Sequence, residues 1–246
     1  MYCDKNNFIF VHIPKTGGST IELLLKPYVS DKIQMIQRHE KEMAWEDDIE
    51  LHITQRGTPH TKHWTLSEHI KNCALVDHVD ELFKFTVVRN PYERMLKLYL
   101  FKLQNGEFKP LPGEPGEKES RTQYRGRHIT DAILGNWRHH MFTEFLEGTR
   151  NVRLMGLRTW LGQYQMCTYN DQYAIDYVLR YENFENDVKE LFTKLDLPVP
   201  EAVPITNSTR PLDQETIKKY YNEQNRKIVE TRYKRDFEEF GYEIWP

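Results

Sequence analysis

The sequence predicts an α/β protein with three layers, in which a central, mainly parallel sheet is flanked by helices. Three short apolar runs rich in β-forming residues have the length of buried strands: residues 8–13, 83–88 and 174–179. The stretches between these runs carry apolar residues at helical spacing. Strands that alternate with helices form parallel sheets, so the pattern predicts this fold class.

The first predicted strand leads into a glycine-containing loop. After that loop, Thr20–Lys26 predicts one or two helical turns, and Pro27 stops them. Residues 30–60 are polar and mixed in charge, and they predict no element. Leu66–Cys73 predicts a short helix before the second strand.

The second predicted strand, Phe83–Val88, ends at the motif that begins with Arg89. Pro91 suits the first turn of a helix, where its missing N–H has no helical partner to lose, so a helix is expected at about 92–103. Residues 106–127 hold glycines and prolines among charges and predict a long loop, either a lid or a plain surface loop. Further helices are predicted at 130–148, 155–161, 184–195 and 214–237, the last with a break near Asn222.

Length, charge and cysteine content narrow the class of protein. The 246 residues fit one large domain or two small ones, and we predict a single domain over 1–246 with a flexible loop insertion at about 106–127. A net charge of −3 gives no field that would attract nucleic acid or an anionic membrane. Three scattered cysteines argue against a disulfide framework and against a zinc site. No apolar run has the roughly 18 residues of a membrane helix, and no signal peptide is evident, so a soluble, cytoplasmic protein is expected.

The string Pro14-Lys15-Thr16-Gly17-Gly18-Ser19-Thr20 follows the first strand and carries the strongest chemical signal. The two glycines let the backbone turn tightly and approach a ligand. The N-terminus of the next helix presents N–H groups and the positive end of its dipole, which suit a phosphate or a sulfate. Lys15 adds a full positive charge, so the string predicts an anion-binding loop in a P-loop-like position.

The order of residues separates this loop from that of ATP- and GTP-hydrolysing proteins. Their motif places the lysine after the glycines, whereas Lys15 precedes Gly17 and Gly18. A nucleotide-dependent kinase therefore stays an alternative hypothesis, and so does a non-catalytic nucleotide-binding protein.

A second motif begins where the second strand ends, at Arg89-Asn90-Pro91. The planar guanidinium of Arg89 suits a phosphate group, and Lys97 follows two helical turns later. Taken alone, Arg89 could equally serve in a salt bridge, and Lys97 could be a solvated helix charge.

Together the two motifs resemble the carbohydrate sulfotransferases that use 3′-phosphoadenosine-5′-phosphosulfate (PAPS), namely the heparan 2-O- and chondroitin-type enzymes and their bacterial relatives. The resemblance implies that Lys15, Thr16, Gly17, Gly18, Ser19 and Thr20 bind the 5′-phosphosulfate and that Arg89 binds the 3′-phosphate. It extends loosely through Arg180–Phe184 to Tyr242 and implies a nucleotide contact at Ser208. The family usually has serine at the position of Lys97, where lysine can make an ionic contact instead. No metal is expected.

Histidines upstream of the second motif are candidates for a general base. The acceptor hydroxyl must lose its proton as it attacks sulfur, and a positioned imidazole can take that proton. We predict His63 as the base, with Lys62 and His60 as acceptor contacts; His60, His12 and His69 compete for the role of base. Surface histidines in a polar loop are the competing interpretation.

The acceptor is expected to be a hydroxyl of a small molecule or a glycan. A locally basic stretch with Arg125 and Arg127 could hold an anionic glycan, or it could be a solvated loop. His139 and His140 are adjacent, so they point apart on a helix and do not predict a metal site. The sequence does not predict an oligomeric state.

Overall fold

The computed structural model describes residues 1–3, 5–29, 63–104, 131–148, 160–204 and 212–245, and at 131–137 and 214 it describes the backbone alone. Within these ranges the chain divides into two compact units. Unit 1 comprises Met1–Arg89 with Leu161–Arg210, and unit 2 comprises Asn90–Trp160 with Pro211–Pro246. The predicted loop at 106–127 and the predicted helix at 155–161, apart from Trp160 and Leu161, lie outside the described residues.

The sheet of unit 1 has four strands in the order β1-β2-β3-β6. Their bounds are Tyr2–Cys3 for β1, Phe8–Val11 for β2, Phe83–Val88 for β3 and Tyr177–Arg180 for β6. The β2–β3 and β3–β6 pairs are parallel, and only the short β1 runs antiparallel to its neighbour. The prediction of a mainly parallel sheet is therefore confirmed in the described part of the chain.

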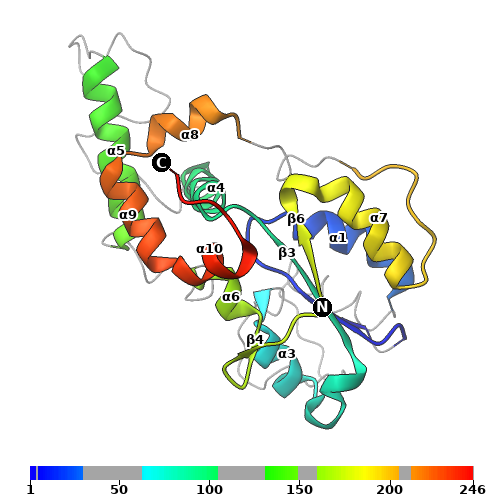
Figure 1. Cartoon of the computed structure of the whole chain (residues 1–246). Helices are drawn as coiled ribbons and strands as arrows, with labels where there is room; N and C mark the ends of the chain where they lie inside the picture. The colour runs from blue at the N-terminus through cyan, green and yellow to red at the C-terminus, as the bar shows by residue number, and fades with distance from the viewer. Residues whose placement is uncertain (4, 30–62, 105–130, 149–159, 205–211, 246) are drawn as a thin grey trace, which may run out of the picture. The chain divides into compact units, whose positions relative to one another are not determined.

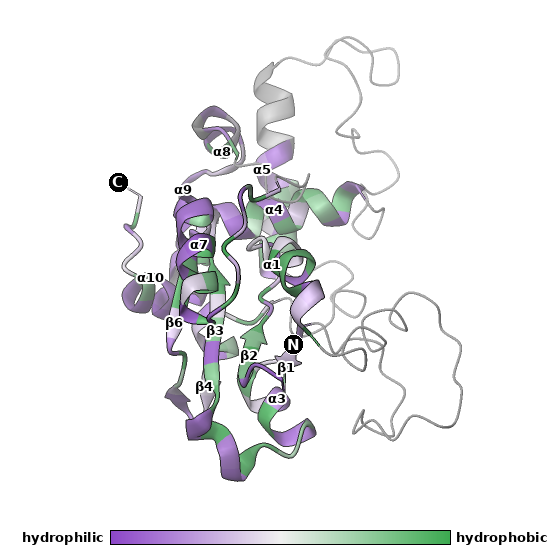
Figure 2. Cartoon of the chain, turned by 90° about the vertical axis from the view of Figure 1, so that its right-hand side faces the viewer, coloured by the Kyte–Doolittle hydropathy of each residue, from purple (hydrophilic) through white to green (hydrophobic). Residues whose placement is uncertain are grey.

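One face of the sheet is covered by two helices, α1 (Gly18–Leu25) and α7 (Phe184–Lys194), which Figure 1 shows side by side. Phe8, Phe10 and Phe85 point to this face and pack with α1 and α7 residues in one core. The alternate strand residues are buried as well. Both faces of the sheet are thus withdrawn from water, as is usual for parallel strands. Figure 2 shows the resulting hydrophobic run along β2.

Short elements complete unit 1. The 3₁₀ turn η1 (Lys26–Tyr28) contains Pro27, the residue expected to stop α1. Helix α3 (Leu66–Asn72) packs against β2, and its start is fixed by reciprocal hydrogen bonds between Thr65 and Glu68. The others are η3 (Val76–Glu81), α6 (Gln163–Met166), β4 (Thr168–Tyr169), β5 (Gln172–Tyr173) and η6 (Tyr181–Asn183).

Unit 2 is helical in its described residues. It contains α4 (Pro91–Gln104), α5 (Asp131–Glu147), α8 (Gln214–Tyr220), α9 (Glu223–Arg232) and α10 (Lys234–Phe240). Aromatic side chains such as Tyr99, Phe142 and Phe145 form its core, with ring centroids 5.1–6.3 Å apart. The Asn222 side chain caps α9, which confirms the predicted break.

No described helix combines the length and the apolar character that crossing a bilayer requires.

Candidate functional site

The three parallel strands of unit 1 end at one edge of the sheet, and the sequence motifs follow them there. The turn Pro14–Gly17 comes shortly after β2, Arg89 comes directly after β3, and Tyr181 comes directly after β6. The Thr86 hydroxyl donates to the Val11 carbonyl at 2.8 Å and holds the first two strand ends together. The carboxyl edge of a parallel sheet is the usual place for a ligand crevice in α/β proteins.

The turn Pro14–Gly17, called the donor turn below, has a constrained backbone. Lys15 has φ 69° and Gly17 has φ 96°, both in the left-handed region that only glycine enters freely. A Cβ atom at Gly17 would lie 3.3 Å from the Phe184 ring and 3.4 Å from the Tyr181 ring. The aromatic segment after β6 therefore packs directly against the donor turn.

The first turn of α1 fits an anion. Thr20 N–H donates to the Gly17 carbonyl at 3.0 Å, and the buried Thr16 hydroxyl donates to the Ile13 carbonyl at 2.9 Å. The hydroxyl of Thr20 is fully buried and has no hydrogen-bond partner among the described residues. A buried hydroxyl without a partner is unfavourable, so an oxygen of a bound phosphate or sulfate group would satisfy it. Lys15, half-buried, supplies the positive charge of the turn.

Arg89 brings the second motif to the first. Its Nη1 donates to the Lys15 carbonyl at 3.4 Å, and its guanidinium carbon lies 3.8 Å from the centre of the Tyr181 ring. The side chain is fully buried under these contacts. Seventy-four residues separate Arg89 from Lys15, so this contact brings two distant motifs of the sequence together.

Gln163 is a structural member of the site that sequence reasoning missed. Its Oε1 accepts from the Arg89 N–H at 2.9 Å, and its Nε2 donates to the Arg89 carbonyl at 2.8 Å. Both backbone groups of Arg89 are therefore held by one fully buried amide. Nothing in the local sequence distinguishes this glutamine from a surface one.

His63, the predicted base, lies beside the start of the donor turn. Its Nδ1 is 2.9 Å from the main-chain oxygen of His12, and the two imidazole rings meet edge to face with centroids 4.7 Å apart. His12 is buried at the end of the strand. His69, the other described competitor, is buried in α3, and burial holds the pKa of its imidazole well below the usual range.

Lys97 and five other predicted site residues lie in unit 2 or outside the described residues. Lys97 is half-buried in α4 and belongs to unit 2. The remaining candidates lie outside the described residues: His60, Lys62, Arg125, Arg127 and Ser208.

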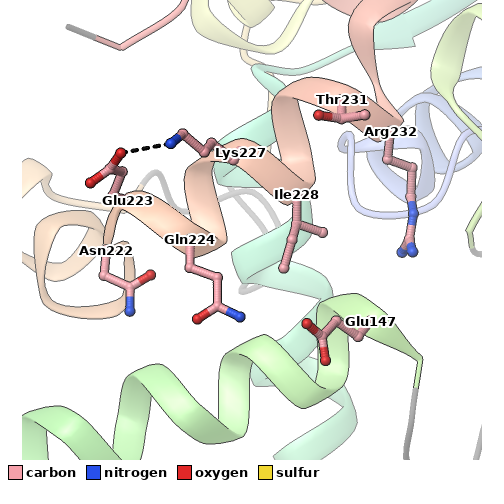
Figure 3. Close-up of a pocket in the computed structure, with 8 residues that line it drawn as sticks. All are labelled: Glu147, Asn222, Glu223, Gln224, Lys227, Ile228, Thr231 and Arg232. Carbon is pink, nitrogen blue, oxygen red and sulfur yellow. Dashed lines mark hydrogen bonds and ion pairs between the residues drawn. The ribbon is translucent and has the colours of Figure 1, made fainter.

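A separate groove of about 1020 Å³ runs along α9 in unit 2. Figure 3 shows Gln224 and Ile228 of α9 pointing toward Glu147 at the end of α5. An adjoining hollow of about 390 Å³ adds His139 and His140, and burial lowers the pKa of the His139 imidazole. The polar lining can hydrogen-bond to hydroxyl groups, but it contains no residue of the two motifs.

The described residues contain no cluster of three or more His, Cys, Asp or Glu side chains that could hold a metal ion. The chain matches a family model described as the sulfotransferase family over residues 1–243. A search of curated proteins and a search of solved structures each gave no match.

Proposed function

The chain belongs to the sulfotransferase family, and we propose that its donor is PAPS and that its acceptor is a hydroxyl group of a carbohydrate. The observation that carries the proposal is the contact between Arg89 and the Lys15 carbonyl. It joins a cradle suited to a 5′-phosphosulfate to an arginine suited to a second phosphate. A donor phosphorylated at both the 3′ and the 5′ position matches this pair of anion-binding groups.

The donor turn and α1 would hold the 5′ end of the donor. PAPS supplies a sulfuryl group on a phosphate leaving group, and negative charge grows on that phosphate as the sulfur–oxygen bond breaks. Lys15 and the N–H groups at the start of α1 would stabilise this charge without moving, which is how fixed donors lower a reaction barrier. Thr20 would use its buried hydroxyl to fix one oxygen of the group.

Arg89 would anchor the 3′-phosphate at a distance from the reacting sulfur. Binding energy from a remote group improves alignment at the reacting centre. Because its side chain is fully buried against Tyr181, a direct contact with phosphate requires part of this packing to open.

His63 would take the proton from the acceptor hydroxyl. A carbonyl oxygen only accepts hydrogen bonds, so the contact with His12 assigns the proton of a neutral His63 ring to Nδ1. Nε2 is then the basic nitrogen. A positioned imidazole of this kind contributes about 10²–10⁴-fold to a rate.

Thermal melting with three ligand conditions tests the donor. The product nucleotide, 3′-phosphoadenosine-5′-phosphate (PAP), should stabilise the chain by about 2.7 kcal/mol when its concentration is 100 times its dissociation constant. ADP with Mg²⁺ should give no such stabilisation. Stabilisation by ADP with Mg²⁺ alone would favour the kinase, and no shift with either nucleotide would favour a protein that binds neither.

Lys15→Ala tests the turn itself. Loss of one charge-stabilising donor should lower turnover with PAPS by roughly 10²–10³-fold. Lys26→Ala is the matched control, because Lys26 is an exposed lysine directly after the last residue of α1, and this change should leave turnover unchanged. Equal turnover in Lys15→Ala and wild type would refute the assignment.

A further inference from the structure

His12 forms a hydrogen bond that spans the donor turn. Its Nδ1 lies 2.6 Å from Oε1 of Glu22, which belongs to the second turn of α1. Only 4% of the His12 side chain and 13% of the Glu22 side chain are exposed, so water competes little for this bond. The pair ties the residue that enters the loop to the helix that leaves it.

The imidazole of His12 is also held by packing. A Cβ atom at Gly18 would lie 2.4 Å from Cδ2 and 2.6 Å from Nε2 of the ring, so the ring occupies the place where any other residue would put its side chain. The Phe10 ring stacks on the His12 ring, and the two ring centroids are 5.6 Å apart. The ring therefore has one orientation while Glu22 holds it.

His63 takes its own geometry from this fixed residue. Nδ1 of His63 donates to the His12 carbonyl at 2.9 Å, and its ring meets the edge of the His12 ring at 80°. These two contacts of His63 thus depend on where His12 lies. A hydrogen bond to a carbonyl at one ring nitrogen selects the tautomer in which the other nitrogen is basic.

We propose that Glu22 and His12 are positioning residues that hold His63 in the tautomer protonated at Nδ1 and keep its Nε2 aligned for proton transfer. The inference rests on the proposed function, in which His63 is the general base. Neither Glu22 nor the His12 side chain is required to touch donor or acceptor. A purely structural pair would stabilise the loop without setting the tautomer of His63.

The experiment compares two changes at Glu22 with a matched pair elsewhere in unit 1. Glu22→Ala removes the acceptor of the His12 hydrogen bond, whereas Glu22→Gln keeps an oxygen that can accept it. The control is Glu81→Ala, because His78 and Glu81 form a similar pair at 3.3 Å with side chains 62% and 74% exposed. Each variant is measured for turnover with PAPS, for the dissociation constant of PAP, and for the state of the His63 ring.

The ring state is read in the chain without nucleotide, by ¹⁵N NMR of histidine-labelled protein at about pH 8.5, where an ordinary imidazole is neutral. His63→Gln assigns the signal. Wild type and Glu22→Gln should show the form protonated at Nδ1. Glu22→Ala should show a mixture of both tautomers.

Turnover should fall on the order of 10–10²-fold in Glu22→Ala, because small misplacements of a reacting group carry losses of this size. It should stay within about fivefold of wild type in Glu22→Gln and unchanged in Glu81→Ala, and PAP binding should change by less than about threefold in all three variants. Parallel losses of turnover and PAP binding in Glu22→Ala would overturn the inference in favour of a structural role.

The NMR result separates this inference from the proposed function. A wild-type His63 protonated at Nε2 overturns the inference even in a chain that transfers sulfate from PAPS. A chain that neither binds PAP nor uses PAPS refutes the proposed function, while the tautomer result still decides the geometry.

Discussion

Gly18→Ala tests the packing at the start of α1 most sharply. The new Cβ would lie 2.4 Å from Cδ2 of His12, so the imidazole must move. Overpacking of this kind costs about 1–3 kcal/mol. Movement of the ring also weakens its hydrogen bond to the nearly buried Glu22 carboxylate, a bond of a type that contributes about 1.5–3 kcal/mol. We expect a loss of about 2–5 kcal/mol in the free energy of unfolding of unit 1.

Two other glycines separate this clash from backbone strain. In Gly17→Ala the nearest described neighbours of the new Cβ are the Phe184 and Tyr181 rings at 3.3 Å or more, but φ of 96° disfavours alanine by about 1–2 kcal/mol. Gly241 has φ of 61°, and no neighbour within the described part of the chain lies within 4 Å of an added Cβ, so Gly241→Ala measures the cost of backbone strain alone. The predicted order of losses is Gly18→Ala first, then Gly17→Ala, then Gly241→Ala.

Urea unfolding of single and double variants gives the decisive measurement. In a His12→Ala background the imidazole is gone, so Gly18→Ala should cost less than about 0.5 kcal/mol, the size of ordinary non-additivity between independent sites. The direct cost of His12→Ala cancels in this double-mutant cycle, because the single variant His12→Ala and the double variant both carry it. A Gly18→Ala loss that is the same with and without the His12 ring would refute the packing argument.

Two further outcomes are expected. Arg89→Ala should weaken binding of PAP more than binding of the analogue that lacks the 3′-phosphate, by about 1.5–3 kcal/mol in calorimetric titration; equal losses would mean that Arg89 acts only through the Lys15 carbonyl. Burial and a 2.6 Å hydrogen bond to Glu230 raise the pKa of Tyr92 above its ordinary value, so its contribution to stability is complete below about pH 10 and is lost as the pH rises further. Tyr92→Phe should therefore flatten the fall in melting temperature between about pH 10 and 12, and an unchanged slope would contradict this assignment.

The strands were predictable where apolar runs met clear boundaries. The observed bounds of β3 are the predicted ones, because an uninterrupted β-forming run ends at an arginine before a proline. The third strand begins at Tyr177 and not at Ala174. Asp176 explains the difference. Its N–H still donates to the Lys84 carbonyl at 2.7 Å, but the Lys84 N–H donates to the Asp176 carboxylate, also at 2.7 Å, so a side chain takes the place of one backbone acceptor.

The helices were predictable in position and less so in their ends. The C-terminal stretch breaks at Asn222 as predicted and again at Tyr233, where no glycine or proline marks a boundary. Tyr233 is almost fully buried in the core of unit 2. Tertiary packing determines this second break, and the helical spacing of apolar residues in the sequence does not predict it.

The sequence predicted which edge of the sheet carries the candidate site, because this depends only on the order and direction of the strands. The donor turn and Arg89 both follow parallel strands, so the sequence already indicated one edge of the sheet. The contacts of Gln163 with Arg89 and of Glu22 with His12 depend on side-chain packing between distant segments. A single sequence carries no periodicity or spacing signal for such pairs.

The backbone of Lys15 makes the two motifs depend on each other. A lysine at φ 69° costs about 1–2 kcal/mol relative to a residue in an ordinary conformation, and a glycine would avoid this cost. The same conformation turns the Lys15 carbonyl to Arg89, whose charged donor at 3.4 Å offsets part of the strain. Strain of this kind persists only where the surroundings enforce it. Arg89 therefore supports the shape of the turn that carries Lys15, so the residue proposed for the 3′-phosphate also conditions the cradle proposed for the 5′-phosphosulfate.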